Sequence, residues 1–355
     1  MYFAVLGKHK QISLAELDYV QPSNLRTHWP IALFDTTKPQ LLSQLWWIIK
    51  WWQIYTRTEI TWMNPEQSLI GTNSRILGQH LKKSWLTKRF KELTLDHCDR
   101  EIQEHGIEYI SIHSDEIISP TTLIGVVQWY QPIWLFECID FDKPSAGMWI
   151  GMMPSKLALT MINTALSYHQ LQHGQQWEYT VYDPFCGFGT TNFLANAHGH
   201  HTIGSDINGS LVKPNLERWK TTSNHRDDRR ITTFKHDATH PITKPFIQHT
   251  DIIVSEWRLW PVVSTRLMPK VAHHQLSQIG TVYCDFLTQV DAYFADITIC
   301  ITIPVYRFYE TNVVYHMISA WEEAYPSRTI QAVPQMYERK WQYVMRQILI
   351  LQKSA

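Results

Sequence analysis

The sequence is poor in several features that would by themselves assign it to a functional class. Its five cysteines are odd in number, scattered and without a paired CxxC spacing, which indicates neither a disulfide framework nor a zinc site and favours a reducing compartment. Lysine plus arginine and aspartate plus glutamate both number 32, so the chain lacks the polycationic surface that grips nucleic acid unaided. Any contact with nucleic acid must therefore be local.

The chain also lacks a long hydrophobic run. Its most hydrophobic stretch, LWWIIKWWQIY at residues 45–55, contains Lys50 and Gln53 and is too short to cross a bilayer. The opening MYFAVLGKHK has no basic leader before its apolar residues, so it predicts a strand rather than a signal peptide. We therefore expect no membrane partner and a cytoplasmic location.

At 355 residues the chain is long enough for two or three domains. The first 60 or so residues predict a small α+β unit, in which Ser13 and Glu16 form the capping box of a helix. Residues from about 60 to 150 predict a second α+β unit, with a helix from 74 to about 93 and with strands that include 133–141.

The predicted helix over 74–93 carries the main concentration of positive charge, from Lys82, Lys83, Lys88, Arg89 and Lys91. A basic helix face is often only solvated. If the protein holds RNA, however, the phosphates should meet this element, and we take Lys82, Lys83, Lys88 and Arg89 as the candidate contacts.

The stretch that points to chemistry is YDPFCGFGT at residues 182–190. Glycines directly after a strand let the backbone pass close to a ligand, and the helix that follows presents unpaired N–H groups. A dinucleotide site is disfavoured because Asn192 stands where a third small residue is needed, and no Gly-Lys-Ser/Thr follows. Asp183 would repel a pyrophosphate and attract a cation, which suits the ammonium and sulfonium of S-adenosylmethionine.

Two further acids follow later predicted strands. Asp206 ends the strand 202–205, where a carboxylate can accept both ribose hydroxyls, and Asp237 follows the strand 231–235, where it could meet an adenine amino group. Each acid alone could be a helix cap or turn former, but the series favours a cofactor at one edge of a parallel sheet. The candidate cofactor-binding residues are Asp183, Pro184, Phe185, Gly187, Gly189, Asp206, Ile207, Asp237 and Ala238.

A fourth predicted strand, 251–254, leads to Ser255 and Glu256 and completes the layout of a methyltransferase. The nearby AHGHH at residues 197–201 suggests a metal, yet it is typical of a helix C-terminus capped by Gly199. We therefore expect no metal ligands there.

Several motifs resemble the THUMP-domain tRNA guanosine-N2 methyltransferases of archaea and eukaryotes. The run from Val5 to Leu17 is similar to the family's "LGR…LSLAE", and GMMPSKLALTMIN at 151–163 to its "GMLPPKLAQIMIN". Residues 45–50 look like its "LGGTIK" with both glycines replaced, 183–190 like "DPFCGSGT", and 344–348 like "VGREI". Gly204-Ser-Asp206 is similar to the second acidic motif of the family.

The resemblance implies an α/β protein in three parts. These are a ferredoxin-like domain over 1–58, a THUMP RNA-binding domain over 59–150, and a Rossmann-like class I methyltransferase domain over 151–355. The family modifies the guanosine at position ten of tRNA with S-adenosylmethionine. A tRNA partner is implied, and a small activating subunit is an open possibility.

The chain departs from the family after the fourth strand, where Ser255-Glu256-Trp257-Arg258 replaces Asp-Pro-Pro-Tyr or Glu-Pro-Tyr. The N2 amine of guanine is a poor nucleophile, so it needs an acceptor for its hydrogens and a ring that stacks the flipped base. Glu256 is the candidate acceptor, Ser255 lies beside it, and Trp257 is the candidate ring. Arg258 must point toward RNA phosphate or pair with Glu256.

Three functions remain open on the sequence. The first is a tRNA guanine-N2 methyltransferase, and the second is a catalytically inactive tRNA-binding protein with a methyltransferase fold. The third is a DNA amino-methyltransferase that shares the glycine turn. Leu157, Met161, Ile162 and Ala165 recur at helical spacing and predict a helix. This helix, whose residues 156–163 match the family, and the N-terminal run disfavour the third function.

Overall fold

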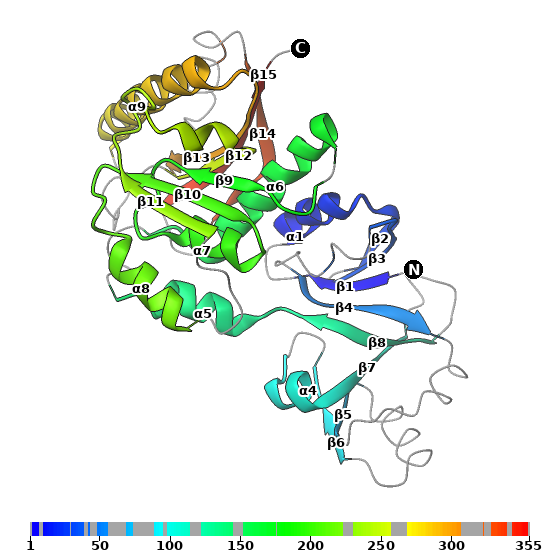
Figure 1. Cartoon of the computed structure of the whole chain (residues 1–355). Coiled ribbons are helices and arrows are strands. Elements are labelled where there is room, and N and C mark those ends of the chain that lie inside the picture. Colours follow the sequence, from blue (N-terminus) through cyan, green and yellow to red (C-terminus); the bar gives the residue numbers. More distant parts are fainter. Residues whose placement is uncertain are drawn as a thin grey trace. The chain divides into compact units, whose positions relative to one another are not determined.

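The computed structural model describes residues 2–6, 10–28, 30–38, 42, 48–55, 69–73, 89–94, 98–113, 122–144, 152–174, 176–222, 230–256, 268–306, 322, 328–338 and 343–353. The chain divides into two compact units, Met1–Pro132 and Ile133–Ala355 (Figure 1). Among the helices of these ranges, none is long and apolar enough to cross a membrane.

The first unit is built on one mixed sheet with the strand order β2-β3-β1-β4-β8-β7-β5-β6. The strands that both predicted N-terminal domains contribute therefore hydrogen-bond into a continuous sheet. Whether this unit comprises a ferredoxin-like and a THUMP domain stays a prediction. Its elements are β1 (Tyr2–Leu6), α1 (Lys10–Leu17), β2 (Ser23–His28), β3 (Ile31–Asp35), β4 (Ile48–Tyr55), β5 (Leu69–Thr72), β6 (Arg89–Glu92), α4 (Arg100–His105), β7 (Gly106–His113) and β8 (Thr122–Tyr130).

Lys50, the charge inside the hydrophobic stretch 45–55, is buried in β4. Its Nζ donates to Glu108 Oε1 at 2.7 Å, and both side chains are 0% exposed. The ammonium also lies 5.8 Å from the centroid of the Tyr130 ring. A buried charge needs such a partner, so the lysine that breaks the run is part of the core of this sheet.

Two expectations for this unit were wrong. Ser13 is not a helix cap, because α1 begins at Lys10 and places Ser13 and Leu17 in the buried part of the helix. Residues 89–92 are not helical, because β6 pairs in parallel with β5, Phe90 opposite Ile70. Tertiary pairing overrides helical propensity here. Arg89 therefore lies in a strand, while Lys82, Lys83 and Lys88 lie outside the described residues.

The second unit alternates strands and helices around a seven-stranded sheet. Its elements are α5 (Ile133–Phe141), α6 (Ser155–His173), β9 (Thr180–Asp183), α7 (Thr190–Ala197), β10 (His201–Asp206), α8 (Lys213–Thr222), β11 (Ile231–Lys235), β12 (Ile252–Ser255), α9 (Pro269–Tyr293), β13 (Thr298–Tyr306), β14 (Arg328–Tyr337) and β15 (Val344–Lys353). The helix expected around Leu157 and Met161 is confirmed as α6.

The strand order of this sheet is β11-β10-β9-β12-β13-β15-β14. β11, β10, β9, β12 and β13 run parallel, and β15 is antiparallel to both β13 and β14. This is a doubly wound, Rossmann-like order with an antiparallel pair of strands at one edge. From β9 the chain adds β10 and β11 on one side and then β12 and β13 on the other, so the strand order reverses between β9 and β12. Ligands bind at such a switch point.

Residues 133–141 were expected as a strand and form helix α5 instead. Leu135, Phe136 and Ile139 are buried while Glu137 is exposed. Strand alternation would have placed Glu137 on the same face as Leu135 and Ile139, whereas a helical turn separates them. A short apolar run does not distinguish the two structures by periodicity alone.

Helices cover both faces of the second sheet (Figure 1). The buried side of α9, which includes Tyr283, Phe286 and Val290, packs in one core cluster with Ile299 and Ile301 of β13. α6 packs against β12 and β13 and against α7. This packing fixes the carboxyl ends of β9, β10 and β12, where the candidate residues stand.

Candidate functional site

The glycine turn between β9 and α7 is shaped by backbone that only glycine adopts easily. Gly187 and Gly189 have positive φ values of 46° and 83°. The amide of Gly187 donates to Asp206 Oδ2 at 3.0 Å, and that of Cys186 donates to the Ser205 carbonyl at 2.9 Å. The turn is thus tied to the end of β10, with the first amides of α7 beside it.

Gly189 has a second requirement besides its backbone angle. A Cβ added there would lie 2.9 Å from the Phe193 ring and from Val212, whereas at Gly199, with a φ of 82°, nothing lies within 4 Å. We expect Gly199→Ala to lose about 1–2 kcal/mol of unfolding free energy from strain alone. Gly189→Ala should lose a further ~1–3 kcal/mol from overpacking. Urea unfolding of both variants checks this, and equal losses would contradict it.

Asp183 is a buried carboxylate at the end of β9. It is 2% exposed, and burial raises its pKa to about 7. The hydroxyl of Ser255 and the amide of Phe185 donate to its Oδ1 and partly oppose that rise. A cation placed beside this buried carboxylate would stabilise its ionised form. Ser255 has no exposed surface and supports Asp183, so a direct catalytic role for Ser255 stays a prediction.

The other two acids flank the turn. Asp206 accepts from the amides of Gly187 and Asn208, one on each carboxylate oxygen. Asp237 accepts from the amide and the hydroxyl of Thr239, which keep its pKa low although burial acts in the opposite direction. Both oxygens of Asp206 and the Oδ2 of Asp237 retain capacity for another donor, such as a hydroxyl or amine.

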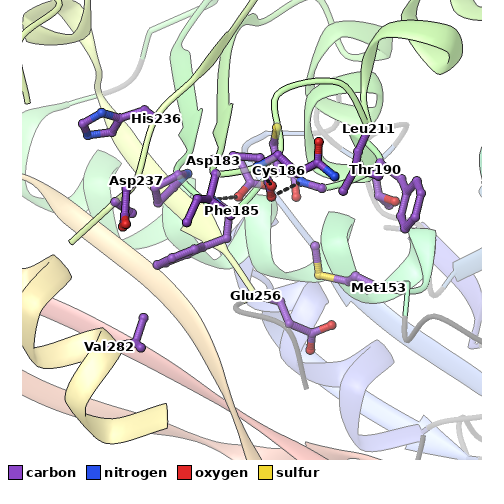
Figure 2. A pocket seen from close by; sticks show the side chains of 18 of the residues that line it. Met153, Asp183, Phe185, Cys186, Thr190, Leu211, His236, Asp237, Glu256 and Val282 are labelled. Atoms are coloured by element: carbon purple, nitrogen blue, oxygen red, sulfur yellow. Dashed lines mark hydrogen bonds between the residues drawn. The ribbon is translucent and has the colours of Figure 1, made fainter. Parts of the chain in front are cut away.

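These residues surround one pocket of about 740 Å³, within the range of small-molecule sites. Figure 2 shows Asp183, Phe185 and Cys186 at its centre, with Asp237 on one side and Thr190 on the other. Of the predicted cofactor residues, Asp183, Pro184, Phe185, Gly187, Asp206, Ile207, Asp237 and Ala238 line it. Gly189 does not line the pocket, and its role is to begin α7.

Glu256 also lines the pocket, but its carboxylate is held by a residue far along the chain that no sequence pattern linked to it. Arg346 Nε of β15 donates to Glu256 Oε1 at 2.6 Å, and the Thr302 hydroxyl donates to the same oxygen at 2.8 Å. Both charged side chains are almost fully buried. In Figure 2 the carboxylate is turned away from Asp183. Trp257 and Arg258, the other candidates of this segment, lie outside the described residues.

Several residues that line the pocket were not predicted from the sequence. Met152, Met153, Val282 and Asp285 line the pocket, and α9, which carries the last two, was not predicted at all. A signal existed for Arg346, because a charged residue within VMRQILIL is expected to be buried only with a partner. The identity of that partner could not be read locally.

The histidines of residues 197–201 behave as a helix end. α7 stops at Ala197, and Gly199 adopts a φ of 82° just beyond it. Within the described ranges, no group of three or more His, Cys, Asp or Glu side chains is arranged to hold a metal ion.

No family model and no curated protein matches the chain. Among solved structures it is similar to the precorrin-6y C5,15-methyltransferase of Geobacter metallireducens GS-15, at 11% identity and a TM-score of 0.38, over 61% of this chain and 95% of that one. It is also similar to Pyrococcus horikoshii TYW2 in complex with MeSAdo, at 12% identity and a TM-score of 0.32, over 53% of this chain and 62% of that one. At these values no family assignment follows.

Proposed function

We propose that the second unit is an S-adenosylmethionine-dependent methyltransferase that acts on the exocyclic N2 amine of a guanosine in tRNA. The observation that carries the proposal is the set of three carboxylates around one pocket at the switch point of the sheet. Asp183 among them is buried and therefore favours a cationic ligand. Bound there, the cofactor would supply a methyl group activated by a sulfonium.

The residues of this chain fit the two ends of such a cofactor. Asp206 and Asp237 have acceptor capacity for ribose hydroxyls and an adenine amine, and exposed Ile207 offers an apolar surface beside them. Asp183 lies where the ammonium and sulfonium would be attracted. On the substrate side, Glu256 would accept a hydrogen of the guanine amine while the nitrogen attacks, and Trp257 would stack the base.

The test is transfer of a radiolabelled methyl group from S-adenosylmethionine to unmodified bulk tRNA, followed by nucleoside analysis. Label in N2-methylguanosine is the expected result. Label in another nucleoside, or in DNA alone, would contradict the proposed substrate. Because the family can need a small activating subunit, the assay is run with the purified chain and with cell extract added.

A second function, a catalytically inactive tRNA-binding protein, is favoured by one observation. Glu256 Oε1 already accepts from Arg346 and Thr302, so this oxygen is engaged before any amine arrives. Under this alternative the wild type binds tRNA and cofactor but transfers no methyl group in either form of the assay.

We expect Asp206→Ala to weaken S-adenosylmethionine binding about ten- to a hundredfold, because charged hydrogen bonds contribute roughly 1.5–3 kcal/mol each. Loss of the contact to the Gly187 amide should add to the effect. Calorimetry measures it. Asp296, a partly exposed acid after α9, serves as control, and its replacement by alanine should leave affinity unchanged.

We further expect tRNA binding to depend on the basic segment of the first unit. Replacing Lys82, Lys83, Lys88 and Arg89 with alanine should lower affinity and reduce the salt slope by about one for each lost phosphate contact. Filter binding at several salt concentrations measures the slope. An unchanged slope would show that the segment is only solvated.

A further inference from the structure

A second cavity lies next to the cofactor pocket, on the turn that follows β10. Its volume is about 440 Å³, and Asn208 lines both cavities, so the two are neighbours. The turn at 208–210, the start of α8 at Lys213 and the end of β11 at Thr233–Lys235 line this second cavity. We refer to it as the lysine groove.

The turn at 208–210 is a fixed wall of the lysine groove. The amide of Asn208 donates to Asp206 Oδ1 at 2.8 Å, and the Ser210 hydroxyl donates to Asn208 Oδ1 at 2.7 Å. A Cβ added at Gly209 would lie 2.8 Å from the Cβ of Lys235, so the glycine lets the turn pack directly against the end of β11. Hydrogen bonds and close packing therefore hold the groove in shape.

The residues that line the lysine groove include two lysines and no acid. Thr233 and Lys235 lie two positions apart in β11 and share one face of the sheet, and Lys213 comes from α8. In the part of the chain that the structure describes, neither ammonium contacts a carboxylate or another hydrogen-bond acceptor. Asp206 stands opposite Lys235 in the β10–β11 register but accepts from two backbone amides instead. Both positive charges are therefore available to a ligand.

A phosphate group matches the chemistry of this lining. The two ammonium groups supply charge and donors, and the Thr233 hydroxyl and the side-chain amide of Asn208 supply further donors. A lysine ammonium is a compact point charge on a flexible stem, so it neutralises a phosphate without fixing its orientation. Contacts of this kind position a nucleic-acid backbone and carry no sequence information.

The position of the lysine groove favours a polymer over a free ion. β11 is the outermost strand on its side of the described sheet, and both lysines are exposed, so the groove is open to solvent. An open site buries little of a free phosphate ion. A polyanion, in contrast, gains from each such contact because its condensed counterions are released.

We propose that the lysine groove binds a phosphate group of the RNA backbone and holds the strand beside the cofactor pocket. Lys213 and Lys235 neutralise the phosphate, and Thr233 and Asn208 donate hydrogen bonds to it. The inference rests on the proposed function, because it requires an RNA substrate. Unlike the basic segment of the first unit, this contact belongs to the unit that carries the pocket.

The test is filter binding of unmodified tRNA to the full chain over a range of potassium chloride concentrations. Lys213→Met combined with Lys235→Met should reduce the salt slope by about one, the value for one lost phosphate contact. Near about 0.15 M salt this corresponds to an affinity loss of about five- to tenfold. Lys213→Arg combined with Lys235→Arg keeps both charges and should retain the slope of the wild type.

The matched control is Lys244→Met combined with Lys353→Met. Both lysines are exposed, and they lie near the end of α9, away from the groove, so this variant removes the same charge elsewhere. Its slope and affinity should equal those of the wild type. Thermal unfolding verifies that each double variant is folded. An unchanged slope in the groove variant, or an equal loss in the control, would overturn the inference.

A calorimetric titration with inorganic phosphate distinguishes the two sources of the group. Saturable phosphate binding that the groove variant abolishes, with tRNA binding unchanged, would assign the groove to a free phosphate and also overturn the inference. A wild type that binds tRNA through the groove but transfers no methyl group overturns the proposed function alone. A wild type that does not bind tRNA overturns both.

Discussion

A Glu256→Gln variant should methylate tRNA about a hundred- to a thousandfold more slowly than the wild type, the usual magnitude for a positioned electrostatic group. Glutamine keeps the shape and one acceptor oxygen but removes the charge that favours the developing positive nitrogen. Glu256→Ala should lower the rate at least as much. Affinity for S-adenosylmethionine should stay near normal in both variants, because the proposed cofactor site assigns that binding to Asp183, Asp206 and Asp237. Single-turnover methylation of unmodified tRNA measures the rate.

The matched control is Glu217→Gln. Glu217 lies on α8, and its side chain is 72% exposed in a short-range pair with Lys220, so its charge should not affect methylation. An active Glu256→Ala variant would contradict the proposed role. An inactive wild type, with extract added, would favour the tRNA-binding alternative.

An Arg346→Met variant should lose about 3–5 kcal/mol of unfolding free energy, because it leaves the buried Glu256 carboxylate without its counter-ion. For a unit of this size such a loss lowers the melting temperature by roughly 6–20 °C. Glu256→Gln combined with Arg346→Met removes both charges and should recover most of the loss. Thermal and urea unfolding of the two single variants and the double variant measure the coupling.

The exposed pair of Lys220 and Glu217 provides the comparison, since Lys220→Met should change stability by about 1 kcal/mol or less. A similarly small effect at Arg346 would show that Glu256 is accommodated without it. The two predictions also separate functions. If Glu256 serves only to anchor its segment to β13 and β15, the wild type transfers no methyl group and removal of Glu256 lowers only the free energy of unfolding.

The parts of the site that the sequence predicted depend on local signals. The turn at 183–190 follows from glycines after an apolar strand, and the acids Asp206 and Asp237 stand where parallel strands end. Such features involve residues that are close in sequence. All of the candidate cofactor residues predicted from them line one pocket, except Gly189. α9 was not predicted, although Ala272, Leu276, Ile279 and Tyr283 recur at helical spacing and would have allowed it.

The errors arose where distant contacts decide the outcome. Residues 89–92 form a strand because β5 pairs with them. Residues 133–141 form a helix, although their short apolar run is equally compatible with a buried strand. From the sequence, Arg258 was expected either to point toward RNA phosphate or to pair with Glu256, and it lies outside the described residues. The described partner of Glu256 is Arg346, 90 residues further along the chain, and no local pattern links the two.

The central claim is that the pocket at the carboxyl ends of β9, β10, β11 and β12 holds S-adenosylmethionine. Isothermal titration of the intact protein with S-adenosylmethionine tests it most directly. One site per chain with micromolar affinity is expected, weakened about ten- to a hundredfold by Asp206→Ala. No binding heat by the folded wild type at several temperatures, or an affinity that Asp206→Ala leaves unchanged, would contradict the claim.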